Sequence, residues 1–531
     1  MRRFSTWLLI VVMLGGIFRL TNLSEKIYWH DETFTALYTT GHGNAEALAL
    51  FDGELKTAGD ILQLQTATAD RGLGATIQQL AVNDAQHPPL YYLMARLMLY
   101  VLPDTVVASR LVAAIAGILL IPATYWLTQE LFGASLPATL SAAIVAISPF
   151  QYLYAQEARE YSLWALTSVV ASAFCLRAIK SNRISSWILY ALSVTVGLYG
   201  CVLTFLIMAS HSLYMLWYAF LQRTNNKQKQ TESPVSTQNN RWLLCRNFAL
   251  SSIMSLLLFF PWLRLITQEH TKKVSWTAVP MPLPTLAKTW AGNLTRLFFD
   301  VNFDNTDPLI YSAIPVLLSL VLIGYVLVWS LRHMPRSAFV FIALLGGVTL
   351  LTFVGPDLII GGRRSAVSRY LIPTYLSLQV AIAYWLSQQL SKPTTRTFGK
   401  VVTTGVLIAG LASCTFSLSA DTWWHKKNSH HNPEVARIIN QTPNSLLVSS
   451  NNNANVGELL SLSHRLAANQ PVLIFTEPTV PTSPLTIEQT AETLFLFNIS
   501  KQSREALEQN YEITPAFAEG RLWQMKPKND A

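Results

Sequence analysis

The feature that most constrains this chain is a series of apolar stretches, each close to the length of a membrane-spanning helix. The hydrocarbon core of a bilayer is about 30 Å thick, and an α-helix needs about 20 residues to cross it. Only 13% of the residues are charged and 51% are hydrophobic, whereas soluble domains carry about 25% charged residues. The sequence therefore predicts an all-α polytopic membrane protein with about 11–13 crossings.

The apolar stretches begin at residues 7–23, directly after Met1-Arg2-Arg3. The others lie at 88–102, 108–130, 134–151, 161–179, 186–200, 201–222, 244–266, 309–331, 337–355, 370–390 and 401–419. No small-residue cleavage site follows the first stretch, so we expect a retained helix with its N-terminus in the cytoplasm. Residues 88–102 contain Arg96 and are short for a crossing, so we expect them to lie in the interface or to re-enter the membrane.

Basic residues in the short loops predict which side of the membrane each loop faces. Because lysine and arginine are enriched in cytoplasmic loops, the linker 223–243, whose composition is polar and disorder-like, is predicted in the cytoplasm. The predicted outer segments are 24–87, 152–160, 267–308, 356–369 and everything after residue 420. The same rule explains the excess of 39 Lys+Arg over 30 Asp+Glu, so no nucleic-acid partner is expected.

The composition changes near residue 421, and the rest of the chain alternates short helix-like and strand-like stretches. We expect strands at 445–449, 471–475, 493–498 and 521–524, and helices at 433–441, 456–468 and 503–509. This pattern predicts a small α/β domain outside the membrane, residues 421–531, after a transmembrane domain formed by residues 1–420. The C-terminal domain carries no glycine-rich phosphate loop and no evident catalytic cluster, which favours a role as a lid or an acceptor platform.

An acidic pair, Asp31 and Glu32, follows the first apolar stretch and is preceded by Tyr28 and Trp29. The pair is expected where lipid headgroups meet water, which suits chemistry on a substrate whose tail stays in the bilayer. Ionisable groups at the edge of a membrane are costly enough to indicate function. The alternative is a pair of solvated acids beside an aromatic belt.

His87 ends the first loop and is followed by Pro88-Pro89-Leu90-Tyr91. Proline disfavours helix in the residue before it and favours the first turn of a helix. His87 is therefore expected at a helix N-terminus, where anions are bound favourably. The alternative is a buried histidine with a purely structural role.

Two further groups lie at the ends of apolar stretches on the predicted outer side. Glu157, Arg159 and Glu160 form the first, and they act either in a site or as an ion-pair staple between loops. Arg363, Arg364 and Arg369-Tyr370 form the second. Arginines there oppose the usual charge bias, and the guanidinium group suits phosphate oxygens. The alternative partner for these arginines is the bulk anionic lipid headgroup.

Together these groups supply a carboxylate base and several cations at the membrane surface. This combination suits the transfer of a sugar from a polyprenyl-phosphate donor to an acceptor. The carboxylate removes a proton from the acceptor hydroxyl, and the cations stabilise the charge on the departing phosphate. Direct displacement of that kind inverts the anomeric configuration. The acceptor class stays open among glycolipid, protein and polysaccharide.

The four motifs, in this order, resemble the bacterial GT-C glycosyltransferases. The resemblance is to the group that contains protein O-mannosyltransferases, the lipid A aminoarabinose transferase and sugar transferases of the lipopolysaccharide core. It rests on Asp31-Glu32, on the run from His87 to Tyr91, on the run from Gln156 to Tyr161, and on Arg369-Tyr370 with Pro373. It implies 11–13 transmembrane helices, juxtamembrane helices in the first outer loop, and a polyprenyl-phosphate-linked donor. It also implies a multi-pass protein of the bacterial inner membrane, with the active site on the periplasmic side.

The resemblance also implies roles for single residues. Asp31 would be the catalytic base, and Glu32 would be its neighbour and orient the acceptor. The groups implied to contact or support the donor phosphate are His87, Arg159, Arg363, Arg364, Arg369 and Tyr370, with Glu157 and Tyr91 as supporting residues; Lys272 and Lys273 lie in a loop that gives only a weak assignment. Some relatives hold a divalent metal with a second acidic motif, for which Glu157 could serve, but this chain has no Asp-x-Asp, so metal independence is expected.

Two other classes of function compete with the enzyme. A transporter or flippase of lipid-linked saccharides would share the many helices and the basic residues. Transporters place their binding residues near the midplane, at broken helices and across internal repeats, whereas the candidate residues here cluster at helix ends and no repeat is visible. The third class is a scaffold in which only the C-terminal domain is functional.

Overall fold

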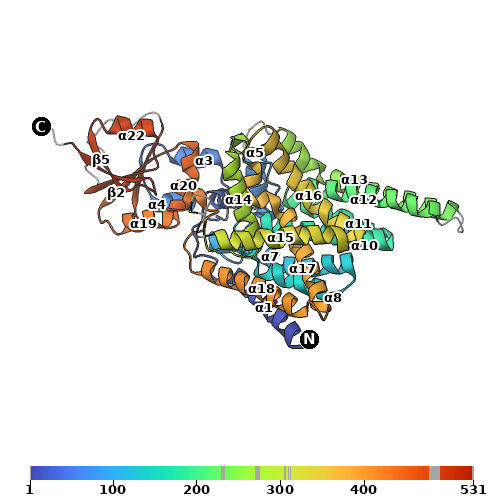
Figure 1. Cartoon of the computed structure of the whole chain (residues 1–531). Coiled ribbons are helices and arrows are strands. Elements are labelled where there is room, and N and C mark those ends of the chain that lie inside the picture. Colours follow the sequence, from blue (N-terminus) through green and yellow to red (C-terminus); the bar gives the residue numbers. More distant parts are fainter. Residues whose placement is uncertain are drawn as a thin grey trace. The chain divides into compact units, whose positions relative to one another are not determined.

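The computed structural model describes residues 2–228, 234–268, 275–303, 307, 308, 310, 312–477 and 491–528. The chain forms two compact units whose segments are interleaved along the sequence (Figure 1). The first unit consists of Met1–Thr21, Ala85–Tyr91 and Ala113–Leu418. The second consists of Asn22–Asp84, Tyr92–Val112 and Ser419–Ala531. Each unit therefore unites residues that are far apart in the sequence.

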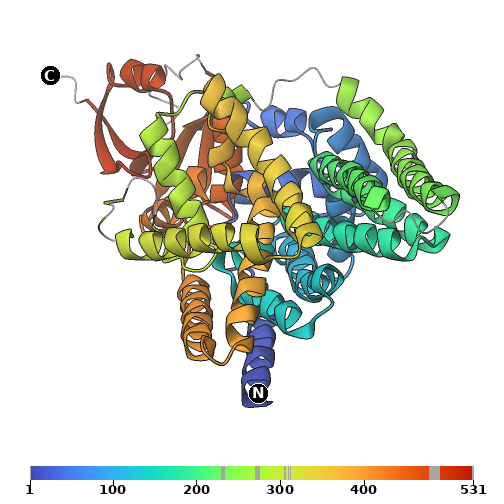
Figure 2. The same cartoon turned by 45° about the vertical axis from the view of Figure 1, so that its right-hand side comes forward.

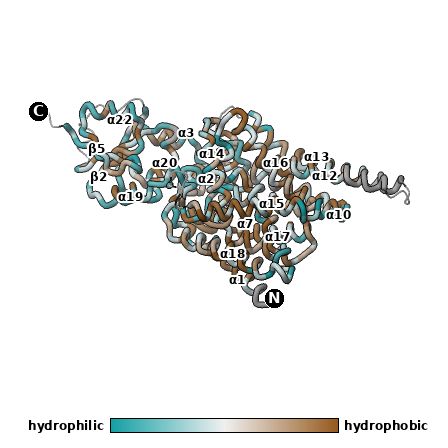
Figure 3. Tube along the Cα trace, in the orientation of Figure 1, coloured by the Kyte–Doolittle hydropathy of each residue, from teal (hydrophilic) through white to brown (hydrophobic). Residues whose placement is uncertain are grey.

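Long apolar helices form the first unit. Their bounds are α1 (Arg2–Leu20), α7 (Thr105–Phe132, which begins in the second unit), α8 (Ser135–Ile147), α9 (Pro149–Ala155), α10 (Tyr161–Ser181), α11 (Ile184–Gly200), α12 (Thr204–Gln228), α13 (Pro234–Gln268), α14 (Leu283–Thr295), α15 (Ala313–His333), α16 (Arg336–Ile359), α17 (Ile372–Ser391) and α18 (Arg396–Leu418). Among the described residues, six helices are long and apolar enough to cross a membrane, and up to seven if the bent pair α8–α9 is one span. Figure 3 shows hydrophobic residues along α7 and α18. The predicted polytopic helical fold is confirmed, while the number of crossings stays a prediction.

Two segments show where the sequence pattern was right and where it was wrong. The stretch 88–102 forms only α6 (Leu90–Leu99), which is about 15 Å long and too short to cross a bilayer. The disorder expected for the linker 223–243 is wrong for residues 223–228 and 234–243. There α12 and α13 continue as helices, and the two helices lie side by side (Figure 2).

The predicted span 134–151 is broken between α8 and α9, which are bent by 59°. Pro149 has no backbone N–H with which to continue α8, so the last carbonyls of α8 need other donors. The buried Arg19 of α1 supplies them and donates to the carbonyl oxygens of Val145 and Ala146 at 2.9 and 2.5 Å. Gly15 permits this approach, since a Cβ there would lie 2.3 Å from Ala146 O.

The break sets the path of the segment that follows α9. Gln156 lies directly after α9, and its Nε2 donates to the carbonyl oxygens of Phe18 and Thr21 at 3.0 and 2.7 Å. Those two carbonyls lie at the end of α1, where helical partners are missing. The end of α1 therefore fixes the start of the run from Gln156 to Tyr161, which carries candidate site residues.

The second unit contains short helices and a mixed sheet. Its further elements are α2 (His30–Thr39), α3 (Asn44–Leu50), β1 (Leu55–Thr57), α4 (Ala58–Gln63), α5 (Leu73–Asn83), α19 (Asn432–Asn440), β2 (Ser445–Ser450), α20 (Asn453–Ser463), β3 (Pro471–Phe475), β4 (Thr493–Phe497), α22 (Lys501–Leu507), β5 (Tyr511–Phe517) and β6 (Leu522–Pro527). The strand order is β1-β3-β2-β4-β6-β5, with β3, β2 and β4 parallel and the other pairs antiparallel. All four predicted strands and three predicted helices are confirmed.

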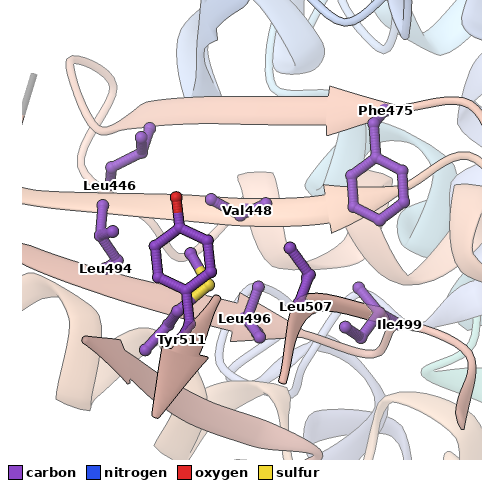
Figure 4. Packing of buried hydrophobic residues seen from close by; sticks show 9 residues of the cluster. Leu446, Val448, Phe475, Leu494, Leu496, Ile499, Leu507 and Tyr511 are labelled. Carbon is purple, nitrogen blue, oxygen red and sulfur yellow. The ribbon is translucent and has the colours of Figure 1, made fainter. Parts of the chain in front are cut away.

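One face of the sheet is apolar, and residues that follow β4 in the chain pack against it. Val448 and Leu496, on the two central parallel strands, pack with Leu507 and Tyr511 in one buried cluster (Figure 4). The sequence pattern missed β5, and it missed β1, which comes from the first loop and pairs with β3. The first loop and the C-terminal region are therefore joined in one sheet.

Candidate active site

The acidic pair lies in the first turn of α2. Trp29 caps the helix with extended backbone, and the Glu32 carboxylate accepts the backbone N–H of Trp29 at 3.3 Å. This arrangement satisfies a donor that the helix start leaves without a partner. Asp31 is half-buried, whereas Glu32 is completely buried. Two neighbouring acids of the same helix therefore have different surroundings.

Glu32 forms two buried ion pairs. Arg110 holds both carboxylate oxygens, with Nε 2.8 Å from Oε1 and Nη2 2.7 Å from Oε2. Lys426 Nζ lies 2.6 Å from the same Oε2. Arg110 also donates to the carbonyl oxygens of Leu23, Lys26 and Ile27, which form the approach to α2. Paired donors of this kind stabilise the carboxylate and occupy its lone pairs, which makes Glu32 an anchor of the helix start.

The first unit holds a cluster around His87. His87 Nδ1 donates to Glu160 Oε1 at 2.7 Å, and Arg159 Nη2 donates to His87 Nε2 at 3.1 Å. Both contacts fit one tautomer, the one with its proton on Nδ1. Glu160 is buried directly before α10, and burial alone would raise its pKa, but the Arg159 guanidinium and the His87 ring lower that pKa to about 2. Glu160 is therefore a fixed negative charge that orients a histidine and an arginine.

Tyr161 joins Arg369 to this cluster. The guanidinium carbon of Arg369 lies 5.3 Å from the centre of the Tyr161 ring, and that of Arg159 lies 6.0 Å from it. Arg369 also lies 5.9 Å from the ring of Tyr370. Cations are attracted to aromatic faces at these distances. Two predicted residues, Arg159 and Arg369, thus lie over the Tyr161 ring; Arg159 also contacts His87, and Arg369 also contacts Tyr370.

The other predicted residues of this unit have different surroundings. Glu157 and Tyr91 are buried, and Glu157 O accepts the backbone N–H of Arg159 at 2.7 Å. Arg364 Nη1 lies 3.0 Å from Asp357 Oδ1. Arg363 Nε donates to Trp276 O at 2.9 Å, and its guanidinium lies over the Trp276 ring. These contacts tie the loop before α17 to residues 275–278 and to the end of α16. Lys272 and Lys273 lie outside the described residues.

Sequence reasoning missed two charged residues of these networks, Arg110 and Lys426. Glu160 was expected, with Glu157 and Arg159, either in a site or in an ion-pair staple, but it had no individual role. Arg110 lies inside an apolar stretch, and a charge there requires a buried partner; that signal could have found it. Lys426 had no local signal, because its partner Glu32 is 394 residues away. Among the described residues, His, Cys, Asp and Glu side chains form no group of three or more that could hold a metal ion.

The chain is similar to known proteins both in part of its sequence and in its fold. Residues 86–231 match the family model described as dolichyl-phosphate-mannose-protein mannosyltransferase. A comparison with curated protein sequences finds no match. The matched range contains His87, Glu157, Arg159 and Glu160, and it ends before the run that carries Arg369.

Solved structures match nearly the whole chain at low identity. ArnT from Cupriavidus metallidurans bound to undecaprenyl phosphate is 12% identical, covers 99% of this chain and 99% of its own, and has a TM-score of 0.53. The apo state of that protein gives 12% identity, 98% coverage of both chains and a TM-score of 0.53. The Archaeoglobus fulgidus oligosaccharyltransferase in the apo form gives 10% identity over 87% of this chain and 64% of its own, with a TM-score of 0.48.

Proposed function

Because this chain is a GT-C superfamily membrane glycosyltransferase, we propose that it moves a sugar from a polyprenyl-phosphate donor to an acceptor hydroxyl with inversion at the anomeric carbon. The superfamily predicted from the sequence is confirmed by the family match and by the fold. The donor, the stereochemistry and the side of the membrane belong to the proposal. The observation that carries it is the cluster in which Arg159 and Arg369 lie over the Tyr161 ring and His87 contacts Arg159.

The cluster supports the binding of a phosphate group. Two guanidinium groups and an imidazole belong to it, and Glu160 is an ion-pair partner of His87 and Arg159. Arginine binds phosphate through paired N–H donors, and positive groups stabilise the charge that develops on a leaving phosphate. The ArnT structure that this fold resembles contains bound undecaprenyl phosphate.

Asp31 is the proposed base. Glu32 is completely buried and already accepts from Arg110 and Lys426, so its lone pairs serve the anchoring of α2. Asp31 is half-buried on the same turn, so part of this residue is exposed to solvent. This difference favours Asp31 over Glu32 as the group that takes the proton. Glu32 then has a positioning role.

The proposed reaction balances as one displacement. The acceptor oxygen attacks the anomeric carbon while the bond from that carbon to the phosphate oxygen breaks. The proton of the acceptor hydroxyl passes to Asp31, and polyprenyl phosphate leaves with the electron pair of the broken bond. The proposed location is the outer face of a bacterial inner membrane, with the N-terminus in the cytoplasm. The acceptor is a glycolipid, a protein or a polysaccharide.

A flippase for lipid-linked saccharides is the alternative function. The α8–α9 break resembles the broken helices that transporters use, and this observation favours the alternative. However, the carbonyls freed by the break are bound by Arg19, whereas a transport site leaves such groups for its substrate. The break therefore has a structural explanation within α1 and α8.

The test is transfer of radiolabel from a panel of polyprenyl-phosphate sugars to endogenous membrane acceptors. Membranes with the wild type are compared with membranes that contain Asp31→Asn at matched expression. Label transfer that the substitution abolishes supports the glycosyltransferase and identifies the donor. Protein-dependent movement of lipid-linked sugar across the bilayer, without transfer from any donor, contradicts it in favour of the flippase.

A further inference from the structure

The start of α2 is tied to the C-terminal region by several contacts within the second unit. The backbone N–H of Ile27 donates to Asp421 O at 2.7 Å, and that of His30 donates to Ser429 Oγ at 3.0 Å. Thr33 Oγ1 lies 3.4 Å from Gly457 O. These contacts come from three separate parts of the C-terminal region. The first two turns of α2 are therefore bound to it through both main chain and side chains.

Glu458 fixes the residue before Asp31. His30 Nδ1 lies 3.2 Å from Glu458 Oε1, and the buried Glu458 also accepts from Ser429 Oγ at 3.2 Å and from Asn432 Nδ2 at 3.3 Å. These neutral donors hold the carboxylate in one orientation. Gly457 lets α20 approach closely, because a Cβ there would lie 2.3 Å from His30 Nδ1.

Lys426 fixes the residue after Asp31. Its ammonium group and the Glu32 carboxylate are both almost completely buried, and they are 2.6 Å apart. Arg110 already holds both oxygens of that carboxylate, so Lys426 is not needed to neutralise it. Burying a second cation is costly, so this ion pair is weak evidence for added stability, and fixing one arrangement is the role that fits it. Lys426 therefore sets the position of Glu32 with respect to the C-terminal region.

The two contacts have one consequence for the residue between them. Successive residues of an α-helix point about 100° apart, so holding His30 and Glu32 fixes the rotation of α2 about its axis. That rotation decides the direction of the Asp31 carboxylate. Both neighbours of Asp31 are thus held by side chains of residues 419–531, more than 390 positions away in the chain.

We infer that Lys426 and Glu458 are positioning residues for catalysis, acting through Glu32 and His30 on the direction of Asp31. The C-terminal region is then an integral part of the catalytic unit, in contrast to the lid or platform expected from its sequence. The inference rests on the proposed function, because it assigns the base to Asp31. It goes beyond that function by naming the residues that orient the Asp31 carboxylate.

The test compares Lys426→Met with the neighbouring variant Lys427→Met in the full-length protein. Lys427 is exposed, so its substitution removes the same charge without touching Glu32. Lys426→Met should lower kcat for label transfer by roughly 10²-fold, the effect of about 1 Å of misplacement at a reacting group. Its affinity for undecaprenyl phosphate, the binding probe, should stay within about twofold of wild type. Lys426→Arg should restore most of the rate, and Lys427→Met should behave as wild type.

The outcomes separate this inference from the proposed function. Transfer by wild type, its loss in Asp31→Asn and a wild-type kcat in Lys426→Met would overturn the inference and leave the function standing. Absence of transfer in wild type, or its persistence in Asp31→Asn, would overturn both. If Lys426→Met does not fold, Glu458→Gln provides the second measurement, with the same expected fall in kcat at constant affinity for undecaprenyl phosphate. A wild-type kcat in folded Glu458→Gln would overturn the inference.

Discussion

His87 Nδ1 lies 2.7 Å from Glu160 Oε1, and Arg159 holds the other nitrogen of the same ring. A basic residue before a double proline is thereby fixed in one tautomer by an acid 73 positions later in the chain. The proposed phosphate site depends on this fixed arrangement, so the pair provides the first two predictions.

Glu160→Gln should weaken the binding of undecaprenyl phosphate by about tenfold, because an amide no longer holds His87 and Arg159 with a full charge; charge-assisted hydrogen bonds are about twice as strong as neutral ones. Equilibrium binding to purified protein measures this effect. Glu130→Gln is the matched control, since Glu130 pairs with Lys180 at 3.2 Å and belongs to a different network. Equal affinity of wild type and Glu160→Gln would refute the positioning role.

The pH dependence of stability should carry a signature of Glu160. Its pKa is lowered from the ordinary 4.5 to about 2 in the folded protein, so its contribution is complete above pH 4.5 and is lost progressively as the pH falls toward 2. Thermal unfolding of wild type and Glu160→Gln should therefore differ by a constant amount above pH 4.5. The difference should shrink below that pH, and a difference that stays constant down to pH 3 would contradict the assignment.

Arg369→Ala should weaken undecaprenyl-phosphate binding more than it destabilises the fold. Arg369 is half-buried and its guanidinium lies over the rings of Tyr161 and Tyr370, contacts worth about 0.5–2 kcal/mol. Binding and thermal unfolding are measured on the same preparation, with the exposed Arg332→Ala as the control. Unchanged affinity in Arg369→Ala would remove this residue from the phosphate site.

The two adjacent glycines of α1 offer a test of the broken span. A Cβ on Gly15 would lie 2.3 Å from Ala146 O, whereas one on Gly16 would have no atom within 4 Å. Overpacking a tight contact costs about 1–3 kcal/mol, while a helical glycine with open space for a Cβ gains about 1 kcal/mol of helix propensity when changed to alanine. Gly15→Ala should lower the unfolding temperature and Gly16→Ala should not. A stabilised Gly15→Ala would show that α1 does not pack as described.

The sequence was most informative where chemistry is local. Apolar length located the helices, and short motifs located His87, Arg159 and Arg369, because these residues lie beside prolines, acids or helix ends that mark them. Short strand-like runs located four strands of the sheet. Each of these patterns lies within a few positions of the residue that it describes.

The parts of the fold and site that the sequence did not predict depend on contacts between residues far apart in the chain, which no local pattern indicates. β1 became a strand only because Leu55 pairs with Leu473 in β3, and three residues are too few to show a period of two. In the sequence, no neighbouring residue distinguishes Lys426 from an ordinary polar residue, because its partner Glu32 is distant in the chain. Arg363 and Arg364 resembled further phosphate ligands, yet their own contacts are with Trp276 and Asp357.

The most direct test of the account is the single-turnover rate of sugar transfer by purified Asp31→Asn with the donor that the wild type uses. Asp52→Asn is the matched control, since Asp52 lies exposed in the same first loop. Asp31→Asn should keep its affinity for undecaprenyl phosphate and lose roughly 10²–10⁴-fold in rate, the contribution of a general base, while Asp52→Asn stays at the wild-type rate. A wild-type rate in Asp31→Asn would contradict the central claim that Asp31 is the base.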